Sequence, residues 1–250
     1  MNIHAALLDP LEQLAGVLEG ARCERRDGYA FLSYPTFPVR DLNGMWAETD
    51  AAAQHIDEAR AEAAEIGTPF SIMVREGRSV AVEEAARAIG FQAAVRIPGM
   101  AVTPEELRDP PLPEVEVLKV ETADGLAQSL AVGAAGFGIP ADLAASIYSL
   151  EVAALDGLEY YLARADGRDV ATAAGFTTGD SVAIFSVATT PEQRGRGYGS
   201  AVTLQAVQDG FAAGARFAVL QSSQMGEPVY RRLGFRELET YVLYTLSRKS

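Results

Sequence analysis

The sequence has little cysteine, little histidine and no long apolar run. Cys23 is the single cysteine of the 250 residues and His4 and His55 are the only histidines, which excludes an internal disulfide and a Cys/His metal cluster. The most apolar stretch, residues 130–150, is interrupted by glycines, a proline and an aspartate, so no membrane span is predicted. The first residues also lack the basic and apolar regions of a signal peptide. We therefore expect a cytoplasmic protein without a metal.

Positive charge is scarce as well. The chain has 21 lysines and arginines against 34 aspartates and glutamates, which gives a formal net charge of -13. Such a field repels phosphate backbones and anionic lipid, so neither nucleic acid nor a membrane surface is expected as a partner. It attracts cations, including protonated amines, although the charge can also serve only to keep the protein in solution.

A proline-rich stretch divides the chain. Residues 103–113 contain four prolines, which resist helix formation and cannot donate the hydrogen bonds of a β-ladder. We predict a linker at residues 109–113 between two domains, residues 1–108 and 114–250, each of ordinary domain size.

The second segment has a clear pattern of alternating and helical apolar spacing. Its order is predicted as β-α-α-β-β-β-α-β-α-β, with tight turns between the three consecutive strands. The expected elements are strands at 115–120, 160–164, 170–177, 182–189, 216–221 and 238–246, and helices at 123–132, 141–154, 199–213 and 227–233. This order predicts an α/β fold with a mixed, mostly antiparallel sheet flanked by helices.

The first segment contains a piece that looks like a copy of the second. A helix at 50–66, a strand at 69–74, a helix at 82–89 and a strand at 92–102 are expected there. Ile89-Gly90-Phe91 matches Leu233-Gly234-Phe235, and a strand follows each at a similar distance. An internal repeat is one interpretation. Chance similarity between two β-α-β pieces is the other.

A glycine-rich loop, Arg194-Gly195-Arg196-Gly197-Tyr198-Gly199-Ser200, lies between a predicted strand and a predicted helix. This arrangement favours the binding of a pyrophosphate. The helix start offers free N–H groups, the glycines permit close approach of the ligand, and the two arginines add positive charge. A nucleoside triphosphate loop requires Gly-Lys-Ser/Thr, which is absent. A dinucleotide loop requires Gly-x-Gly-x-x-Gly early in a βαβ unit, whereas this loop runs Gly-x-Gly-x-Gly and follows an antiparallel meander. An acyl-coenzyme A loop and a plain structural turn remain.

At this point the segment resembles the GNAT superfamily of N-acetyltransferases. The residues from Arg194 to Gly199 satisfy every position of the family pattern Arg/Gln-x-x-Gly-x-Gly/Ala. Phe185-Ser186-Val187-Ala188-Thr189 looks like the family's fourth strand, and residues 228–235 look like its Tyr-x-x-x-Gly-Phe segment, with Tyr230 at the tyrosine. The resemblance covers about residues 114–247.

The resemblance implies acetyl-CoA as the acyl donor and direct attack by an amine. Tyr230 is then the candidate general acid, since a phenol with a reference pKa of about 10 can reprotonate a departing thiolate. The alternative is that Tyr230 only packs against the cofactor. The resemblance implies these residues for cofactor binding: Val187, Ala188, Thr189, Arg194, Gly195, Arg196, Gly197, Tyr198, Gly199 and Ser200.

The general base is not evident, because residues 181–189 contain no acid, although family members often carry a glutamate there. Glu151, Glu159 and Glu227 are candidates by location, and a water relay that ends at Ser186 or a backbone carbonyl is another. The acceptor is expected to be a primary amine of a small molecule or peptide, and the protein a monomer or homodimer. A non-catalytic acyl-CoA-binding sensor or scaffold is the alternative function.

The first segment is expected to be a degenerate GNAT-like half. It lacks the Arg-x-x-Gly-x-Gly loop, and Ala86 stands where the repeat has Tyr230. Without a proton donor or a phosphate site, its expected role is to pack beside the active half and shape the acceptor site. The chain is thus predicted to have one working site.

Overall fold

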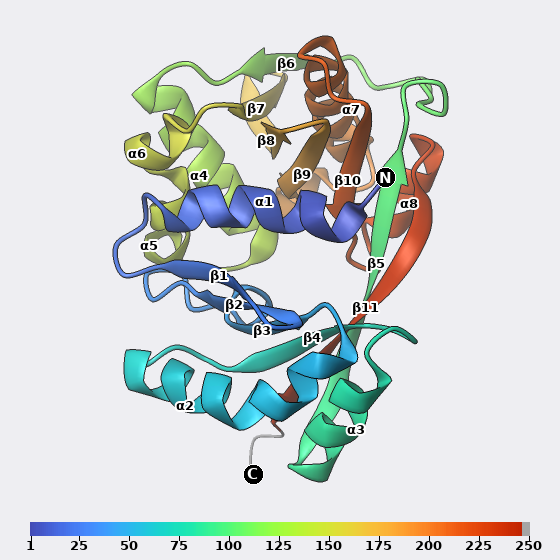
Figure 1. The fold of residues 1–250 in the computed structure, drawn as a ribbon. Coiled ribbons are helices and arrows are strands. Elements are labelled where there is room, and N and C mark those ends of the chain that lie inside the picture. Colours follow the sequence, from blue (N-terminus) through green and yellow to red (C-terminus); the bar gives the residue numbers. More distant parts are fainter. Residues whose placement is uncertain (247–250) are drawn as a thin grey trace. The chain divides into compact units, whose positions relative to one another are not determined.

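The computed structural model describes residues 1–246, which form two compact units (Figure 1). Unit 1 consists of Met1–Pro10 and Met100–Glu237, and unit 2 consists of Leu11–Gly99 together with the chain from Leu238. No helix within residues 1–246 is both long and apolar enough to cross a membrane. The same residues contain no cluster of three or more side chains suited to hold a metal ion.

Unit 1 is built on a mixed sheet in the order β5-β10-β9-β8-β7-β6. The strands β6 to β9 pair antiparallel in sequence, whereas β10 pairs parallel with β9. Asp166 and Gly167 form the tight turn between β7 and β8. Both have positive φ, as a type I′ turn requires. The strands are β5 (Phe91–Val102), β6 (Glu116–Lys119), β7 (Leu158–Ala165), β8 (Arg168–Thr178), β9 (Ser181–Thr189) and β10 (Phe217–Gln221).

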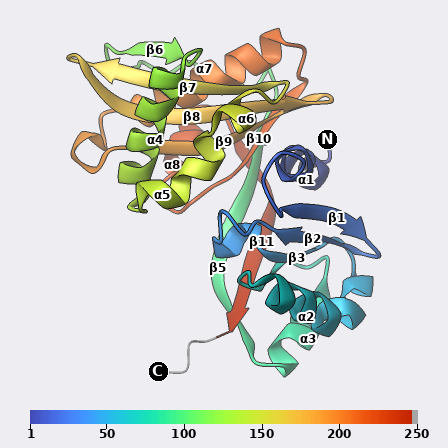
Figure 2. The same cartoon turned by 90° about the vertical axis from the view of Figure 1, so that its left-hand side faces the viewer.

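Helices cover both faces of this sheet, as the alternation of its side chains requires. Tyr161 and Ala173 pack in one apolar cluster with α7, whereas Tyr160 and Ala174 pack in another with the helices that follow β6. Figure 2 shows α4, α5 and α6 gathered on one face. The helices on that face are α4 (Ala123–Phe137), α5 (Ala141–Ala144), η3 (Ala145–Tyr148) and α6 (Leu150–Ala153). The remaining helices of unit 1 after β9 are η4 (Pro191–Gln193), α7 (Tyr198–Ala212) and α8 (Glu227–Arg232).

The strands of unit 2 follow the order β1-β2-β3-β4-β11-β5 and are also mixed in direction. The first three strands form an antiparallel meander, β4 runs parallel to β3, and β11 runs antiparallel to β4. The elements are α1 (Ile3–Ala15), which begins in unit 1, β1 (Arg22–Arg26), β2 (Tyr29–Ser33), η1 (Arg40–Leu42), β3 (Gly44–Ala47), η2 (Asp50–His55), α2 (Ile56–Ile66), β4 (Ser71–Arg75), α3 (Val80–Ala88) and β11 (Arg236–Leu246).

The same order of elements occurs twice along the chain. The run β1-β2-β3-α2-β4-α3-β5 matches β7-β8-β9-α7-β10-α8-β11, and each run contains one parallel pair, β3 with β4 or β9 with β10. The expected α/β fold of two similar halves, each with a mixed sheet flanked by helices, is confirmed.

The boundaries of the two compact units differ from the predicted domain boundary at residues 109–113. Beside β4 lies β11, from the end of the chain, and beside β10 lies β5, so each half completes the sheet of the other unit with its last strand. Val242 and Tyr244 of β11 are buried in the core of unit 2. Met100 and Val102 of β5 are buried in the core of unit 1. Apolar alternation predicts a strand but does not say which strand lies beside it.

Two predicted helices are divided, and the first of them, at 50–66, forms η2 and α2. Residues 141–154 form α5, η3 and α6 rather than one continuous helix. The chain is extended at Ser149, whose hydroxyl accepts a hydrogen bond from the N–H of Val152 and begins α6.

Shortening a buried side chain of β11 should destabilise unit 2. Val242 is 4% exposed and packs in the unit 2 core, so Val242→Ala should lower the free energy of unfolding by about 2 kcal/mol. Leu238→Ala is the matched control on the same strand, because Leu238 is 44% exposed. Urea unfolding measures both, and equal effects of the two substitutions would contradict the assignment of β11 to this core.

Candidate active site

The glycine-rich loop leads directly into α7. Gly195 and Gly197 have φ of 77° and 90°, a region that L side chains rarely adopt. Gly197 is the N-cap of α7, and no side chain caps the helix there. The first N–H groups of α7 therefore remain available at the positive end of the helix dipole.

The surroundings of the loop glycines differ. A Cβ on Gly197 would lie 3.0 Å from Cδ of Pro113, and a Cβ on Gly199 would lie 3.3 Å from Oγ1 of Thr189. A Cβ on Gly195 would meet no atom within 4 Å. The linker thus lies against the loop at Gly197, while the backbone at Gly195 is open to solvent and to a ligand.

The two arginines of the loop have different environments. Arg194 donates hydrogen bonds to the carbonyl of Gly136 at 2.6 Å and to the carbonyl of Thr189 at 3.4 Å. It therefore ties the loop to the end of α4 and the end of β9. Arg196 is exposed, and its guanidinium has no hydrogen-bond or ion-pair partner within residues 1–246. Arg196 is thus the loop cation that is free to meet an anion.

A bulge interrupts β9 before the loop. Thr172 of β8 lies opposite Ala188 and Ala174 lies opposite Phe185, so two residues of β9 face one residue of β8. Ser186, the first of these two, has a φ of 51°. The bulge therefore lies beyond Ala183, the last residue of β9 that pairs with β10.

Strands β9 and β10 separate towards the loop. Their last paired residues are Ala183 and Val219, although β9 continues to Thr189 and β10 to Gln221. Among residues 1–246, the N–H and C=O groups on this edge of β9 have no strand partner beyond Ala183. Such backbone groups need a hydrogen-bond partner. Val187 and Thr189 are half-buried there and Ala188 is buried. The edge can therefore bind an extended ligand through its backbone.

Tyr230 is a buried phenol close to this separation. It shares an apolar cluster with Ile184 and Leu220, the residues that follow the last β9–β10 pair. Tyr230 is 7% exposed, and its hydroxyl has no hydrogen-bond partner within residues 1–246. Burial raises the pKa of Tyr230 to about 12, so the phenol keeps its proton at neutral pH.

The candidate carboxylates are not brought to the bulge of β9. Glu159 of β7 is paired with Lys119 of β6, and β8 separates β7 from β9. Glu227 pairs with Arg231 on α8, and Glu151 is exposed on α6. Of the groups named from the sequence for a base or relay, Ser186 is the one that lies on the bulge.

Two buried polar groups of unit 1 were not predicted from the sequence. Gln221 ends β10 beyond its last pair, and its amide nitrogen is buried without a hydrogen-bond partner within the described residues. Tyr148 of η3 is 5% exposed, and its hydroxyl is also buried without a partner. No motif marks either one, because each depends on contacts between distant segments.

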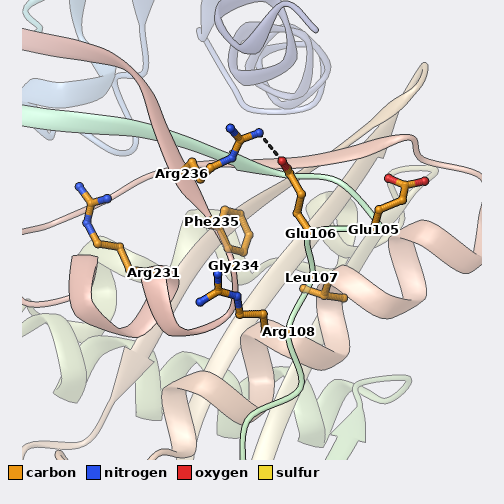
Figure 3. A pocket seen from close by; sticks show the side chains of 8 residues that line it. All are labelled: Glu105, Glu106, Leu107, Arg108, Arg231, Gly234, Phe235 and Arg236. Carbon is orange, nitrogen blue, oxygen red and sulfur yellow. Dashed lines mark hydrogen bonds and ion pairs between the residues drawn. The ribbon is translucent and has the colours of Figure 1, made fainter.

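A charged cavity of about 530 Å³ lies elsewhere in unit 1, beyond the end of α8 (Figure 3). Arg236 pairs there with Glu106, and Arg231 pairs with Glu227 and Glu237. None of its lining residues belongs to the loop, the bulge or the open edge of β9, so we treat it as separate from the candidate site. The lining residues are Glu105, Glu106, Leu107, Arg108, Arg231, Gly234, Phe235 and Arg236.

The corresponding part of unit 2 lacks these features. Strands β3 and β4 stay paired up to Trp46 and Met73, next to the last residue of β3. The first turn of α2 carries Asp57 and Glu58, which disfavour an anion. Ala86 is fully buried at the position that Tyr230 has in the other repeat.

Comparisons with known proteins agree with this geometry. Residues 156–237, which include β7 to β10, the loop and α8, match the family model described as an acetyltransferase (GNAT) domain. This stretch of the chain is thus similar to the acetyltransferase domain of the GNAT superfamily. The superfamily uses acetyl-CoA as its acyl donor. No curated protein matches the sequence.

Solved structures share the fold over nearly the whole chain. A GCN5-related N-acetyltransferase from Kribbella flavida is 23% identical, with a TM-score of 0.74, over 98% of this chain and 95% of that chain. A functionally unknown conserved protein from Staphylococcus epidermidis is 16% identical, with a TM-score of 0.66, over 92% and 95%. A GCN5-related N-acetyltransferase from Sphaerobacter thermophilus is 17% identical, with a TM-score of 0.63, over 90% and 82%. At these identities the likeness shows the fold alone.

Replacing the two loop arginines should separate their structural roles. Arg194→Ala removes the hydrogen bonds to two backbone carbonyls, so it should lower the free energy of unfolding by about 1 kcal/mol. Arg196→Ala removes no such bond and should leave stability unchanged. Thermal unfolding without ligand measures both, and an equal loss of stability in the two variants would contradict the distinction.

Proposed function

We propose that the chain is an acetyl-CoA-dependent N-acetyltransferase that acts on a primary amine of a small molecule or peptide. The observation that carries this proposal is the open edge of β9, which runs from the bulge at Ser186 to the glycine-rich loop, with Tyr230 in the adjoining cluster. A backbone edge, an anion site and a proton donor are together what thioester aminolysis requires.

The donor site is proposed to extend along this edge. The N–H groups from Gly195 to Ser200 suit the pyrophosphate, because they lie at the start of α7 and no side chain caps them. The backbones of Val187, Ala188 and Thr189 suit the pantetheine amides, and Arg196 adds a free positive charge. Arg194 supports the site by holding the loop, and Tyr198 and Gly199 form the first turn of the helix.

The proposed chemistry needs no covalent intermediate on the protein. Bound acetyl-CoA would supply the thioester carbonyl that the amine attacks and the thiolate that leaves. Backbone N–H groups near Val187 would stabilise the oxyanion, and Tyr230 would give its proton to the leaving sulfur. Cys23 is not expected to act as a nucleophile, since burial raises the pKa of its thiol to about 12.

The class of acyl acceptor that we propose follows from the net charge of the chain. The net charge of -13 favours a cationic amine over an anionic acceptor and disfavours nucleic acid and anionic membranes. A monomer or homodimer, and a cytoplasmic location, stay predictions. We also keep the proposal of one working site, because unit 2 has neither the loop nor the tyrosine.

The direct test is incubation with acetyl-CoA and a panel of amines, in which release of the coenzyme A thiol is followed over time. Thiol release that depends on the amine supports the transferase. Acetyl-CoA binding without release for any amine would instead support an acyl-CoA-binding sensor or scaffold.

Tyr230→Phe should lower kcat by about a hundredfold, the typical contribution of a general acid. It should leave acetyl-CoA affinity nearly unchanged, because the ring remains in the cluster. The pKa of Tyr230, raised to about 12, keeps the phenol protonated below about pH 11. In the native enzyme kcat should therefore rise as the amine loses its proton and should not fall up to about pH 10. A loss of affinity with kcat intact, or a fall of kcat above pH 8, would show that Tyr230 is not the acid.

Gly197→Glu should abolish acetyl-CoA binding. The new side chain would place negative charge at the helix start, on a backbone with φ of 90° beside Pro113. Gly167→Glu is the matched control, because Gly167 has a similar φ of 70° in the β7–β8 turn. Calorimetric titration measures both, and native affinity in the Gly197 variant would refute the loop assignment.

A further inference from the structure

The cavity beyond the end of α8 has the size of a small-molecule site. Its volume is about 530 Å³, and known ligand pockets range from roughly 300 to 1,000 Å³. Two segments of unit 1 line it: residues 105–108 of the proline-rich stretch, and residues 231–236 at the end of α8 and the start of β11. Figure 3 shows the side chains of both segments around the cavity.

Main-chain contacts hold the two segments together. The N–H of Arg108 donates to the carbonyl of Leu233 at 3.0 Å. Gly234 has a φ of 98°, and a Cβ at this position would lie 2.1 Å from the carbonyl oxygen of Glu106. Glycine alone permits such an approach, so the walls of the cavity are fixed by the backbone. Arg108 is therefore attached to a rigid part of the wall.

The cavity has an apolar part. Phe235 is 2% exposed and belongs to the apolar core of unit 1, and Leu107 is partly buried against the same core. Both residues line the cavity. A ligand that has an apolar body can therefore bury it here, which an inorganic ion cannot do.

Most of the charge around the cavity is already compensated. Three arginines and two glutamates line it. Arg236 forms an ion pair with Glu106, and Arg231 forms ion pairs with Glu227 and Glu237. Two of the three guanidinium groups thus have carboxylate partners in the protein.

Arg108 is the lining cation without a counter-charge. It is exposed, and its guanidinium has no hydrogen-bond or ion-pair partner in the described part of the chain, residues 1–246. Figure 3 shows the guanidinium of Arg108 and the carboxylate of Glu105 directed away from each other. The planar guanidinium offers a fork of N–H donors that matches the oxygens of a carboxylate or a phosphate.

The net charge of -13 does not exclude an anion at this position. At physiological ionic strength the field of exposed charges decays over about 8 Å, so the nearest groups decide the local attraction. Beside the cavity the nearest uncompensated group is Arg108.

We propose that this cavity binds a small organic anion, whose carboxylate or phosphate group pairs with Arg108 and whose apolar body lies against Phe235 and Leu107. The site is additional to the proposed acetyl-CoA site, because none of its lining residues belongs to the glycine-rich loop or the open edge of β9. The inference therefore goes beyond the proposed function and does not depend on it.

The test is a titration of the full, isotope-labelled chain followed by nuclear magnetic resonance. Benzoate and phenyl phosphate are the anionic probes, and benzamide is the uncharged analogue of benzoate. The amide signals of Gly234 and Phe235 report on the cavity. Those of Gly195 and Gly197 report on the glycine-rich loop, which is the other candidate anion site.

Arg108→Ala is the decisive variant, since it removes the cation but no side-chain contact in the described residues and should fold normally. Arg232→Ala is the matched control. Arg232 ends α8, is also exposed and also has no ion-pair partner in residues 1–246, but it does not line the cavity.

Benzoate, phenyl phosphate or both should shift the signals of Gly234 and Phe235, whereas benzamide should not. A response to one probe alone identifies the head group that the site takes. The Kd should rise about tenfold in Arg108→Ala, as expected for the loss of a charged hydrogen bond, and stay native in Arg232→Ala.

Three results would overturn the inference: shifts confined to Gly195 and Gly197 or absent altogether, equal binding of benzamide, or native affinity in Arg108→Ala. Each of them leaves the proposed function intact. Conversely, a chain that releases no thiol with any amine but binds the anion through Arg108 would refute the proposed function and uphold this site.

Discussion

The early end of the pairing between β9 and β10 is the constraint on which the site depends. Beyond Ala183 and Val219 the two strands no longer exchange hydrogen bonds, so the backbone of β9 up to Thr189 needs other partners. The bulge at Ser186 and the uncapped start of α7 lie on the same continuous segment. One stretch of main chain therefore presents an open edge and an anion site in succession, and both are built from N–H groups rather than from side chains.

Unit 2 shows how little of this follows from the order of elements. It repeats the meander, the parallel pair and the crossover helix, yet β3 and β4 remain paired almost to the end of β3. Their backbones approach so closely that a Cβ on Gly44 would lie 2.0 Å from the carbonyl oxygen of Ser71. The fold is thus compatible with a closed sheet or an open one. Function depends on the local separation of the strands.

Local patterns predicted the elements of unit 1 and its loop, because apolar spacing and glycine positions reflect contacts within a short segment. Long-range pairing could not be predicted in this way. Alternation in residues 238–246 indicated a strand, but not that β11 lies beside β4. Likewise, nothing in the sequence near Arg194 indicates that its guanidinium binds the carbonyl of Gly136, 58 residues away. Tyr148 was assigned to a plain helix, although Ser149 interrupts that helix and Tyr148 is directed to the sheet.

Two buried tyrosines of unit 1, Tyr230 and Tyr148, lie in clusters on opposite faces of the sheet. Tyr230 belongs to the cluster with α7 and α8, and Tyr148 to the cluster with α4. Burial raises the pKa of both, so both are neutral phenols at physiological pH. Tyr230 lies in the cluster that contains Ile184 and Leu220, where the β9–β10 pairing ends, whereas Tyr148 packs against Tyr160 on the other face. A phenol without a protein partner can give its proton to a leaving group. Proton donation to the leaving sulfur is therefore assigned to the face of the sheet that carries α7 and α8.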